Sequence, residues 1–236
     1  MATYVMSDLH GNYEFFIKML ETIGFCDDDT LYVNGDVIDR GPNGIKILMH
    51  MMMYPNIFPI CGNHEYAALE VLPSLCEEMT KESIKDLDDN FVRNILEYLN
   101  IGGQTTLDEF NKLSNDDKQY VIEYLEEFDM YAQVNVGGKQ FVIVHAGLLN
   151  FMPDRKLDTY APFELLFKRP DYEDVYFQDK YLITGHTPTR FIDGAEADKI
   201  YINNNNHIAI DCGVSFGGTL GCIRLDDLQP FYAKID

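Results

Sequence analysis

Three short apolar segments alternate with two amphipathic segments in the first sixty residues. Residues 3–7, 30–34 and 57–61 have the length and composition of buried strands, and the stretches between them carry apolar side chains at helical spacing. Strands of one sheet that are joined by helical crossovers run parallel. This part of the chain therefore predicts a βαβαβ unit with a parallel sheet.

The pattern changes twice after this unit. The region from about residue 66 to 130 is acidic and helical in its spacing, which predicts a helical insert. Strands dominate afterwards, and both Gly137-Gly138 and the run Asn203-Asn204-Asn205-Asn206 are typical of hairpin loops. The expected strands are residues 131–136, 139–144, 181–184, 200–203, 207–211, 221–225 and 231–235. We expect one domain of the α/β (α+β) class over residues 1–236, with the insert at about 66–130.

The charge balance and the apolar pattern exclude several classes of partner. The chain has 18 Lys and Arg against 39 Asp and Glu, a formal net charge of −21, so its surface repels long nucleic acids. No apolar run approaches the roughly 18 residues that span a bilayer, and the N-terminus lacks the basic segment of a secretory signal. The five cysteines form no C-x-x-C pair. We expect a cytoplasmic protein with reduced thiols and no membrane partner; its oligomeric state is left open.

Five of the expected strands end in polar loops. Ligands of α/β sheets bind beyond the carboxyl ends of the parallel strands, so these loops can converge on one site. Each motif alone is common in proteins, but their joint occurrence after successive strands is not. His50 and His207 lie outside these loops and are interpreted as structural. The loops are Ser7-Asp8-Leu9-His10-Gly11, Gly35-Asp36-Val37-Ile38-Asp39-Arg40-Gly41, Gly62-Asn63-His64-Glu65, His145-Ala146-Gly147 and Gly185-His186-Thr187.

The residue types in these loops indicate a centre with two metal ions. Asp8 and His10 are two positions apart, so in an extended chain they point to the same side and can hold one ion. Asp36 is the natural bridge, because a carboxylate has enough lone pairs for two cations. The candidates that would complete the second ion's shell are Asn63, His145 and His186. Mixed oxygen and nitrogen ligands suit Mn, Fe or Zn, and we expect Mn to support activity in vitro.

The remaining polar side chains of the loops suit phosphate chemistry. Two ions about 3.5 to 4 Å apart can share a hydroxide and clamp the phosphoryl oxygens during in-line displacement. His64 is the candidate general acid for the leaving oxygen, with Asp39 orienting its ring and supporting the imidazolium. Arg40 offers a guanidinium fork that matches phosphate oxygens.

These motifs resemble the signature of the phosphoprotein phosphatase (PPP) branch of the calcineurin-like metallophosphoesterases, which reads GDxHG, GDxVDRG, GNHE, HGG and GH. The resemblance extends over residues 7–187, most of the chain. It implies a four-layer fold, in which two mixed β-sheets pack as a sandwich between helices, together with two metal ions and the roles given above. Ser7, Ile38 and Ala146 depart from the pattern but leave the ligands and charges intact.

The C-terminal half indicates which members of this family the chain resembles most. The SAPNYC segment of the eukaryotic enzymes is absent, and Ile208-Ala209-Ile210-Asp211-Cys212-Gly213 is similar to the ending of bacterial and phage-type serine/threonine phosphatases. Leu165-Leu166-Phe167-Lys168-Arg169 is similar to an L-x-W-x-R stretch of bacterial members. The resemblance therefore makes Arg169 the candidate second phosphate-binding residue, with Arg190 as the fallback.

The resemblance implies a metal-dependent phosphoesterase acting on phosphate monoesters, a serine/threonine protein phosphatase with a phosphoprotein or a small phosphate ester as substrate. A symmetric bis(5'-nucleosyl)-tetraphosphatase shares the same motifs and is the alternative. An aromatic stack with cationic phosphate grips, in the insert or after Gly147, would favour this alternative. A catalytically inactive binding scaffold is the third interpretation, which the complete set of ligands disfavours.

Overall fold

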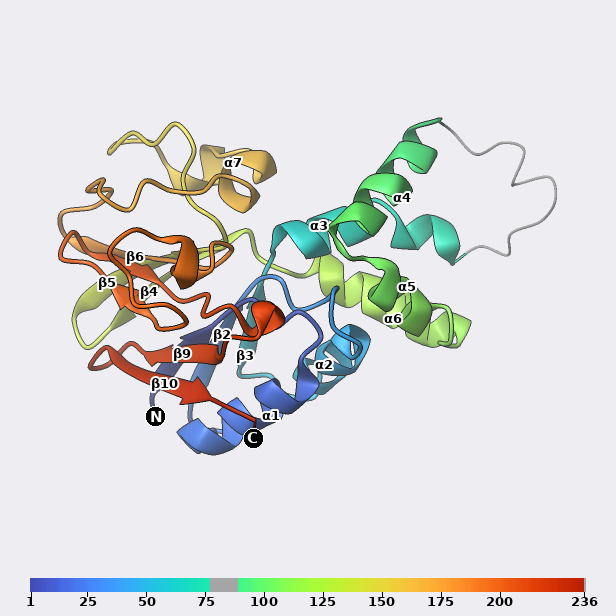
Figure 1. The fold of residues 1–236 in the computed structure, drawn as a ribbon, viewed down its shortest axis with the longest axis horizontal. Coiled ribbons are helices and arrows are strands. Elements are labelled where there is room, and N and C mark those ends of the chain that lie inside the picture. The colour runs from blue at the N-terminus through green and yellow to red at the C-terminus, as the bar shows by residue number, and fades with distance from the viewer. Residues whose placement is uncertain (77–88, 236) are drawn as a thin grey trace.

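The computed structural model describes residues 1–76 and 89–235 and has two five-stranded sheets at its centre (Figure 1). In the first sheet β1, β2 and β3 are parallel neighbours, as the βαβαβ pattern predicts, and β9 and β10 extend it in antiparallel fashion. The spatial order is β10 (Gln229–Ala233), β9 (Leu220–Arg224), β1 (Thr3–Met6), β2 (Thr30–Asn34) and β3 (Ile57–Ile60).

The second sheet is also mixed. Strands β5, β6 and β8 run parallel, and the two edge strands pair with them in antiparallel fashion. Its spatial order is β4 (Tyr131–Val136), β5 (Lys139–Val144), β6 (Lys180–Thr184), β8 (His207–Ala209) and β7 (Tyr201–Ile202). Two mixed sheets flanked by helices confirm the predicted fold class.

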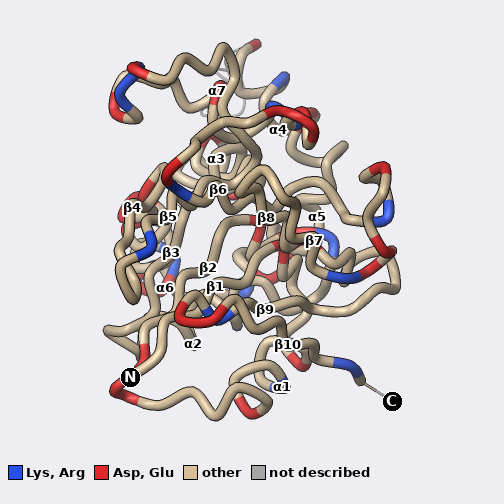
Figure 2. Tube along the Cα trace, turned by 90° about the vertical axis from the view of Figure 1, so that its left-hand side faces the viewer, with Lys and Arg blue, Asp and Glu red and all other residues tan. Residues whose placement is uncertain are grey.

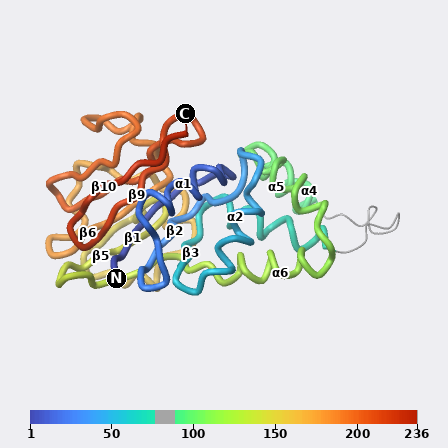
Figure 3. Tube along the Cα trace, turned by 90° about the horizontal axis from the view of Figure 1, so that it is seen from below, coloured from blue at the N-terminus to red at the C-terminus, as the bar shows by residue number. Residues whose placement is uncertain are grey.

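Helices lie outside the sheets and beside them. Helices α1 (Tyr13–Ile23) and α2 (Gly44–Met51) connect the parallel strands of the first sheet, and α7 (Pro162–Leu166) precedes β6. Figures 1 and 3 place α4, α5 and α6 beside the sheets rather than between them. The helices between β3 and β4 are α3 (Asn63–Leu69), α4 (Asp89–Ile101), α5 (Gln104–Phe110) and α6 (Asn115–Glu126). Short 3-10 turns are η1 (Leu72–Leu75), η3 (Leu157–Thr159), η4 (Thr189–Phe191) and η5 (Val214–Phe216).

The helical region differs in its bounds from the expected insert. The sequence predicts helices from about residue 66, whereas α3 already begins at Asn63, within the Gly-Asn-His-Glu motif. Asn63 and His64 therefore lie in the first turn of a helix. Residues 77–88 of the expected insert lie outside the described residues.

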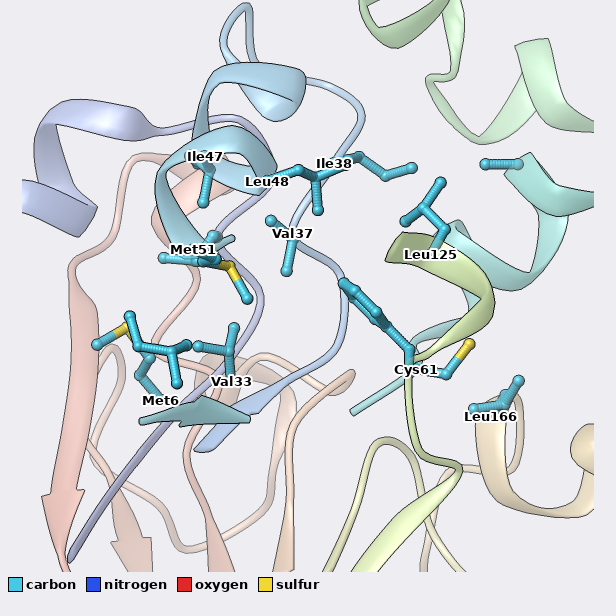
Figure 4. Close-up of a cluster of buried hydrophobic side chains, with 14 of the residues drawn as sticks. Met6, Val33, Val37, Ile38, Ile47, Leu48, Met51, Cys61, Leu125 and Leu166 are labelled. Atoms are coloured by element: carbon cyan, nitrogen blue, oxygen red, sulfur yellow. The ribbon is translucent and has the colours of Figure 1, made fainter. Parts of the chain in front are cut away.

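Side-chain alternation along the strands divides the core into two clusters. Tyr4 and Met6 of β1 belong to the cluster that includes α1 and α2, whereas Val5 between them points to the other sheet. Figure 4 shows Met6 and Val33 close to Met51 of α2. The second cluster fills the space between the sheets and contains Val5, Ile60, Phe141, Ile143, Ile183, Ile208, Ile210, Ile223 and Leu225. Each fully buried aliphatic side chain of this kind contributes roughly 1.5 to 3 kcal/mol to folding.

Two predicted hairpin loops are confirmed, and one strand is displaced. Gly137 and Gly138 both have positive φ and join the antiparallel pair β4–β5, and the asparagine run joins β7 to β8. Strand β10 begins at Gln229, two residues before the expected start, because Leu228 adopts a φ of 61° and closes the turn early. Pro230 is tolerated there since β10 is an edge strand.

The acidic side chains and the thiols are distributed as follows. Asp and Glu occur at every edge of the trace in Figure 2. None of the helices in the described part of the chain has the length and the apolar run needed to cross a bilayer. The five cysteines are all free, and Cys61, Cys212 and Cys222 are buried.

His207 makes a testable contribution to the pH dependence of folding. Burial lowers the pKa of this side chain to about 4, while its Nε2 lies 3.0 Å from the hydroxyl of Thr184. The unfolded chain binds the proton near the ordinary pKa of 6.5, so the folded state loses stability as the pH falls from 6.5 towards 4. Protonation of this side chain should lower the unfolding free energy of the parent by about 2 kcal/mol between pH 7 and pH 5. We expect the unfolding free energy of His207→Gln to fall by about 2 kcal/mol less over the same range.

The measurement is urea unfolding of both proteins at the two pH values. Glutamine keeps a hydrogen-bonding group for Thr184 but does not titrate. An equal fall in the variant and the parent would show that His207 does not carry this pH dependence.

Candidate functional site

The candidate residues of all five polar loops follow the carboxyl ends of strands β1, β2, β3, β5 and β6. Backbone hydrogen bonds join these loops directly. The amide of Asp8 donates to the carbonyl of Gly35 at 3.0 Å, and that of His10 donates to Asp36 at 2.8 Å. The amide of Gly185 donates to the carbonyl of His145 at 2.8 Å. The convergence expected from the sheet topology is therefore present.

Backbone strain concentrates in these loops. Ten non-glycine residues of the described chain have positive φ, and six of them belong to the candidate site. Such conformations cost of order 1 to 3 kcal/mol each and persist only where the surroundings enforce them. The six residues are Asp8, His10, Asp36, Asp39, Arg40 and His186.

Asp36 lies at the centre, and its two carboxylate oxygens face different partners. Oδ2 lies 3.6 Å from Nε2 of His10 and 3.8 Å from Nε2 of His64. Oδ1 lies 3.3 Å from Nε2 of His145. Two groups of candidate metal ligands result, and both contain Asp36: one is His10, Asp36 and His64, and the other is Asp36, His145 and His186. A carboxylate shared in this way can bridge two cations.

The imidazole rings are oriented by hydrogen bonds on their outer nitrogens. Nδ1 of His10 lies 3.1 Å from the carbonyl of Ile38, and Nδ1 of His145 lies 3.0 Å from the carbonyl of Asn34. Both rings thereby turn Nε2 towards Asp36, which is the usual support of metal-binding histidines. The amide oxygen of Asn63 lies 3.1 Å from Nε2 of His145, so it reaches the same place.

Asp8 is held by the backbone of the loop that contains His186. Both of its carboxylate oxygens accept the backbone N–H of His186, at 3.1 and 3.0 Å. It belongs to neither of the two ligand groups found among the described residues, and His64 stands in the group with His10 instead. Burial, with the Asp36 charge, raises the pKa of Asp8 to about 7.

The protonation states suit a site for cations. Burial lowers the pKa of His10 and of His186 to about 3, so both rings are neutral at pH 7 and can act as ligands. Although burial opposes it, the charge of Asp36 raises the pKa of His145 to about 10. The charges of His145 and His64 overcome burial and hold the pKa of Asp36 well below its usual range. The residues present therefore fit two divalent cations, which would take the place of the proton on His145.

His64 and Asp39 form a buried pair beside the ligands. Nδ1 of His64 lies 2.7 Å from Oδ2 of Asp39, and both side chains are fully buried. Although burial opposes it, the charge of Asp36 and the hydrogen bond to Asp39 raise the pKa of His64. The pair therefore has the arrangement of a general acid and its orienting carboxylate.

Arg40 is exposed and contacts two of the site's histidines. Its Nη1 lies 2.8 Å from Nε2 of His10 and its Nη2 lies 3.0 Å from Nε2 of His64. Nη1 also reaches the hydroxyl of Ser215 at 3.4 Å, and the guanidinium lies 5.5 Å from the ring centroid of Phe216. The fork of Arg40 is thus aimed at the metal-ligand cluster.

The two arginines considered for a second phosphate contact differ in their partners. Arg190 is occupied, since it is paired with Asp198 at 2.6 Å and donates to the carbonyl of Phe216 at 3.0 Å. Arg169 is exposed and adds to the lowering of the pKa of His186, which burial dominates. Arg169 also lines a cavity of about 420 Å³. Arg169 therefore stays the candidate for the second phosphate contact, with Arg190 as the fallback.

Glu65 is a component that the sequence reasoning missed. Its buried carboxylate accepts the backbone N–H groups of Asp36, Val37, Ile38 and Gly62 at distances from 2.8 to 3.2 Å. A single side chain thus holds two of the converging loops together. The motif contains Glu65, but nothing in its spacing indicates that these amides are its partners.

A family comparison explains this combination of loops. The family model of the calcineurin-like phosphoesterases matches residues 1–213 of the chain. The chain belongs to the calcineurin-like phosphoesterase family. Members of this family are hydrolases that typically depend on two metal ions, and the ligand groups around Asp36 fit this chemistry.

Curated relatives of this calcineurin-like phosphoesterase are named symmetrical bis(5'-nucleosyl)-tetraphosphatases. The protein of Acidovorax ebreus is 26% identical over 151 residues, which is 63% of this chain and 45% of that protein. The protein of Salmonella paratyphi B is 33% identical over 89 residues, which is 37% of this chain and 32% of that protein. The matched part of the chain thus spans less than half the length of either relative.

Solved structures share the fold. A candidate diadenosine tetraphosphatase aligns with a TM-score of 0.64 at 15% identity, over 98% of this chain and 92% of that one. A serine/threonine phosphatase of Saccharomyces cerevisiae aligns with a TM-score of 0.59 at 13% identity, over 100% of this chain and 80% of that one. At these identities the likeness concerns the fold alone.

Proposed function

We propose that this member of the calcineurin-like phosphoesterase family hydrolyses phosphate esters or anhydrides with two divalent cations. The observation that carries the proposal is the position of Asp36, whose two oxygens face two separate sets of donors. The residues that would hold the cations are Asp8, His10, Asp36, Asn63, His145 and His186. Mixed oxygen and nitrogen donors suit Mn, Fe or Zn, and Mn is the ion to test first.

The chain's own residues bind the phosphate and supply a proton. The six candidate ligands would hold two cations, whose chemistry would be to supply hydroxide as the nucleophile at neutral pH and to neutralise charge on the phosphoryl oxygens. Arg40, whose fork already points at the cluster, donates to the phosphate oxygens. His64 protonates the leaving oxygen while Asp39 keeps its ring in place and stabilises the charged form. Arg169 provides the second cationic contact to the substrate.

Two substrate classes follow from the sequence and the comparisons. A phosphomonoesterase acting on phosphoproteins or small esters needs only the features described so far. A dinucleoside tetraphosphate hydrolase needs in addition a place for a nucleoside, and this is the activity in the names of the curated relatives.

A cavity beside the site favours the second class. It has a volume of about 420 Å³ and touches the site through Thr187, which follows His186. Lys168 and Arg169 contribute cations to its lining, and Phe191 contributes an exposed ring. The carboxylates of the lining belong to Asp171, Glu173 and Asp193, so only the end formed by Lys168 and Arg169 suits phosphates. Cations with an aromatic surface are what a nucleotide requires, because the phosphates pair with the cations and the base stacks on the ring. We therefore propose the dinucleotide as the preferred substrate and the phosphomonoester as the second candidate.

The test compares turnover by protein that has been stripped of metal and resupplied with Mn. The substrates are diadenosine tetraphosphate, a phosphoserine peptide and p-nitrophenyl phosphate. A kcat/KM that is highest for the dinucleotide supports the preferred substrate, and one highest for the peptide supports the protein phosphatase. No turnover of any of the three would contradict the proposal and favour a binding scaffold.

Phe191 provides a sharper test of the same cavity. We expect Phe191→Ala to raise the KM for diadenosine tetraphosphate about tenfold, since stacking of a base on an aromatic ring is worth about 1 to 3 kcal/mol. The KM for p-nitrophenyl phosphate should change less than about twofold, because this substrate is too small to need the cavity. Phe163→Ala is the matched control, since Phe163 is 62% exposed against 60% for Phe191 but lies in α7 outside the cavity lining. Equal changes in the two variants would contradict a nucleoside site at Phe191.

A further inference from the structure

The carboxylate of Asp39 is hydrogen-bonded on both oxygens, and only one of them faces His64. Oδ2 accepts Nδ1 of His64 at 2.7 Å. Oδ1 accepts the hydroxyl of Tyr98 at 2.7 Å and that of Thr106 at 2.6 Å. All four residues have an exposed fraction of 0%. The orientation of this carboxylate is therefore determined by protein donors.

The two hydroxyl donors come from a distant part of the sequence. Tyr98 lies in α4 and Thr106 lies in α5, whereas Asp39 lies in the loop after β2. The hydroxyl of Thr106 also accepts the backbone N–H of Asp39 at 3.0 Å. This one hydroxyl therefore binds both the backbone and the carboxylate of Asp39. The next residue is held as well, because the N–H of Arg40 donates to the carbonyl of Gly102 at 3.0 Å. One helical corner, residues 98–106, thus supports two successive residues of the catalytic loop.

Glycines allow this corner to pack tightly. A Cβ on Gly103 would lie 2.6 Å from the ring of Tyr98. A Cβ on Gly102, whose φ is +110°, would lie 2.9 Å from Cγ of Arg40. The φ of Gly102 favours glycine, and at both positions a Cβ would collide with its neighbour.

The need to satisfy buried hydroxyls does not by itself account for this convergence. Tyr124 of α6 has a buried hydroxyl with no hydrogen-bond partner among the described residues, so the same helical region tolerates an unpaired one. Tyr98 and Thr106 instead place two donors on a single oxygen of one carboxylate. Burial, with the Asp39 charge, raises the pKa of Tyr98 well above its usual range, so its hydroxyl remains a donor.

We propose that Tyr98 and Thr106 are positioning residues, which hold Oδ1 of Asp39 so that Oδ2 fixes the ring of His64 towards the leaving oxygen of the substrate. The inference rests on the proposed function, in which His64 is the general acid. Among the described residues, both hydroxyls are hydrogen-bonded to Asp39 and neither to a candidate metal ligand, so both act through Asp39. Without them the carboxylate can rotate, and His64 then delivers its proton from a poorer position.

The test uses the nearly isosteric variants Tyr98→Phe and Thr106→Val in the full chain loaded with zinc. Initial rates are measured with p-nitrophenyl phosphate, phenyl phosphate and β-glycerophosphate, whose leaving groups become more basic in this order. Protonation matters most for the most basic leaving group. We expect kcat to fall about tenfold or more with β-glycerophosphate and less than about threefold with p-nitrophenyl phosphate, with KM and metal content unchanged.

Two further variants serve as controls. Tyr124→Phe removes a hydroxyl of the same helical region that has no partner among the described residues, and it should leave all three rates unchanged. Thr106→Ser keeps a hydroxyl at the position of Thr106 and should restore the rate with β-glycerophosphate to within about threefold of the parent. A second readout is the NMR resonance of the ring N–H between His64 and Asp39, which should shift in Tyr98→Phe and Thr106→Val but not in Tyr124→Phe.

The possible results separate this inference from the proposed function. A loss of kcat that is equal for all three substrates, or no loss compared with Tyr124→Phe, overturns the positioning role. His64→Asn is measured with the same substrates. One outcome is that the loss of kcat in His64→Asn grows with the basicity of the leaving group while kcat of Tyr98→Phe and Thr106→Val shows no such trend. In that case the inference fails, and His64 stands as the general acid. If His64→Asn shows no such trend, the role of His64 in the proposed function fails, and the positioning role fails with it.

Discussion

Asp36→Asn is expected to lower kcat by more than about a thousandfold and to reduce bound metal from two ions per chain to one or none. Loss of a residue that merely supports a ligand costs roughly 10- to 100-fold in affinity or activity, and Asp36 faces both groups of candidate ligands directly. An amide has one neutral oxygen in place of two charged ones, so it cannot serve both groups. The exchange also removes the charge that raises the pKa of His145.

The measurement combines elemental analysis of metal with steady-state kinetics at saturating Mn. Asp28→Asn is the matched control, since it makes the same chemical change at an exposed position of a turn. We expect the control to retain two ions and full turnover. Near-normal activity of Asp36→Asn would contradict the bridging role, and loss of folding is excluded by comparing unfolding curves of the two variants.

His64→Asn is the prediction with the second largest effect. We expect kcat to fall by about 10² to 10⁴ with an alkyl phosphate, which is the usual contribution of a general acid. The metal content should stay at two ions per chain. The metal content distinguishes a general acid from a metal ligand. This test is needed because Nε2 of His64 lies 3.8 Å from Oδ2 of Asp36, and His64 belongs by distance to one of the candidate ligand groups.

Metal analysis and the pH profile of kcat are the measurements for His64→Asn. Replacement of His50, which lies in α2 away from the converging loops, provides the control for loss of a histidine. Loss of one ion from His64→Asn would place His64 among the ligands and contradict its role as the acid. Retention of both ions together with the slow turnover supports the role proposed here.

Strands, helices and hairpin loops whose conformation is set by nearby residues in the sequence could be predicted well. Period-two and helical spacing located the strands of the first sheet, and the paired glycines located the hairpin between β4 and β5. The parallel arrangement then implied that Asp36 and His145 would meet, although 109 positions separate them in the printed sequence. The carboxyl ends of parallel strands share one edge within each sheet, and the packing of the two sheets brings the end of β2 to the end of β5.

The parts that could not be predicted depend on contacts between distant segments. Nothing local to Tyr98 or Thr106 indicates that they meet Asp39, since the register of α4 and α5 against the catalytic loop is set by packing. The same holds for Glu65, whose four amide partners belong to two loops. The two-residue spacing of Asp8 and His10 predicts a shared ion, but both residues adopt positive φ, which is not extended chain, and the carboxylate of Asp8 faces the amide of His186.

Asp36 belongs to both groups of candidate metal ligands, and this has a thermodynamic consequence for metal binding. Because one carboxylate belongs to both donor groups, a cation in either group changes the charge that the other group presents. The two binding free energies therefore include a coupling free energy, which by linkage is the same whichever group fills first. A calorimetric titration of the metal-free chain should thus require two interacting sites rather than two independent ones.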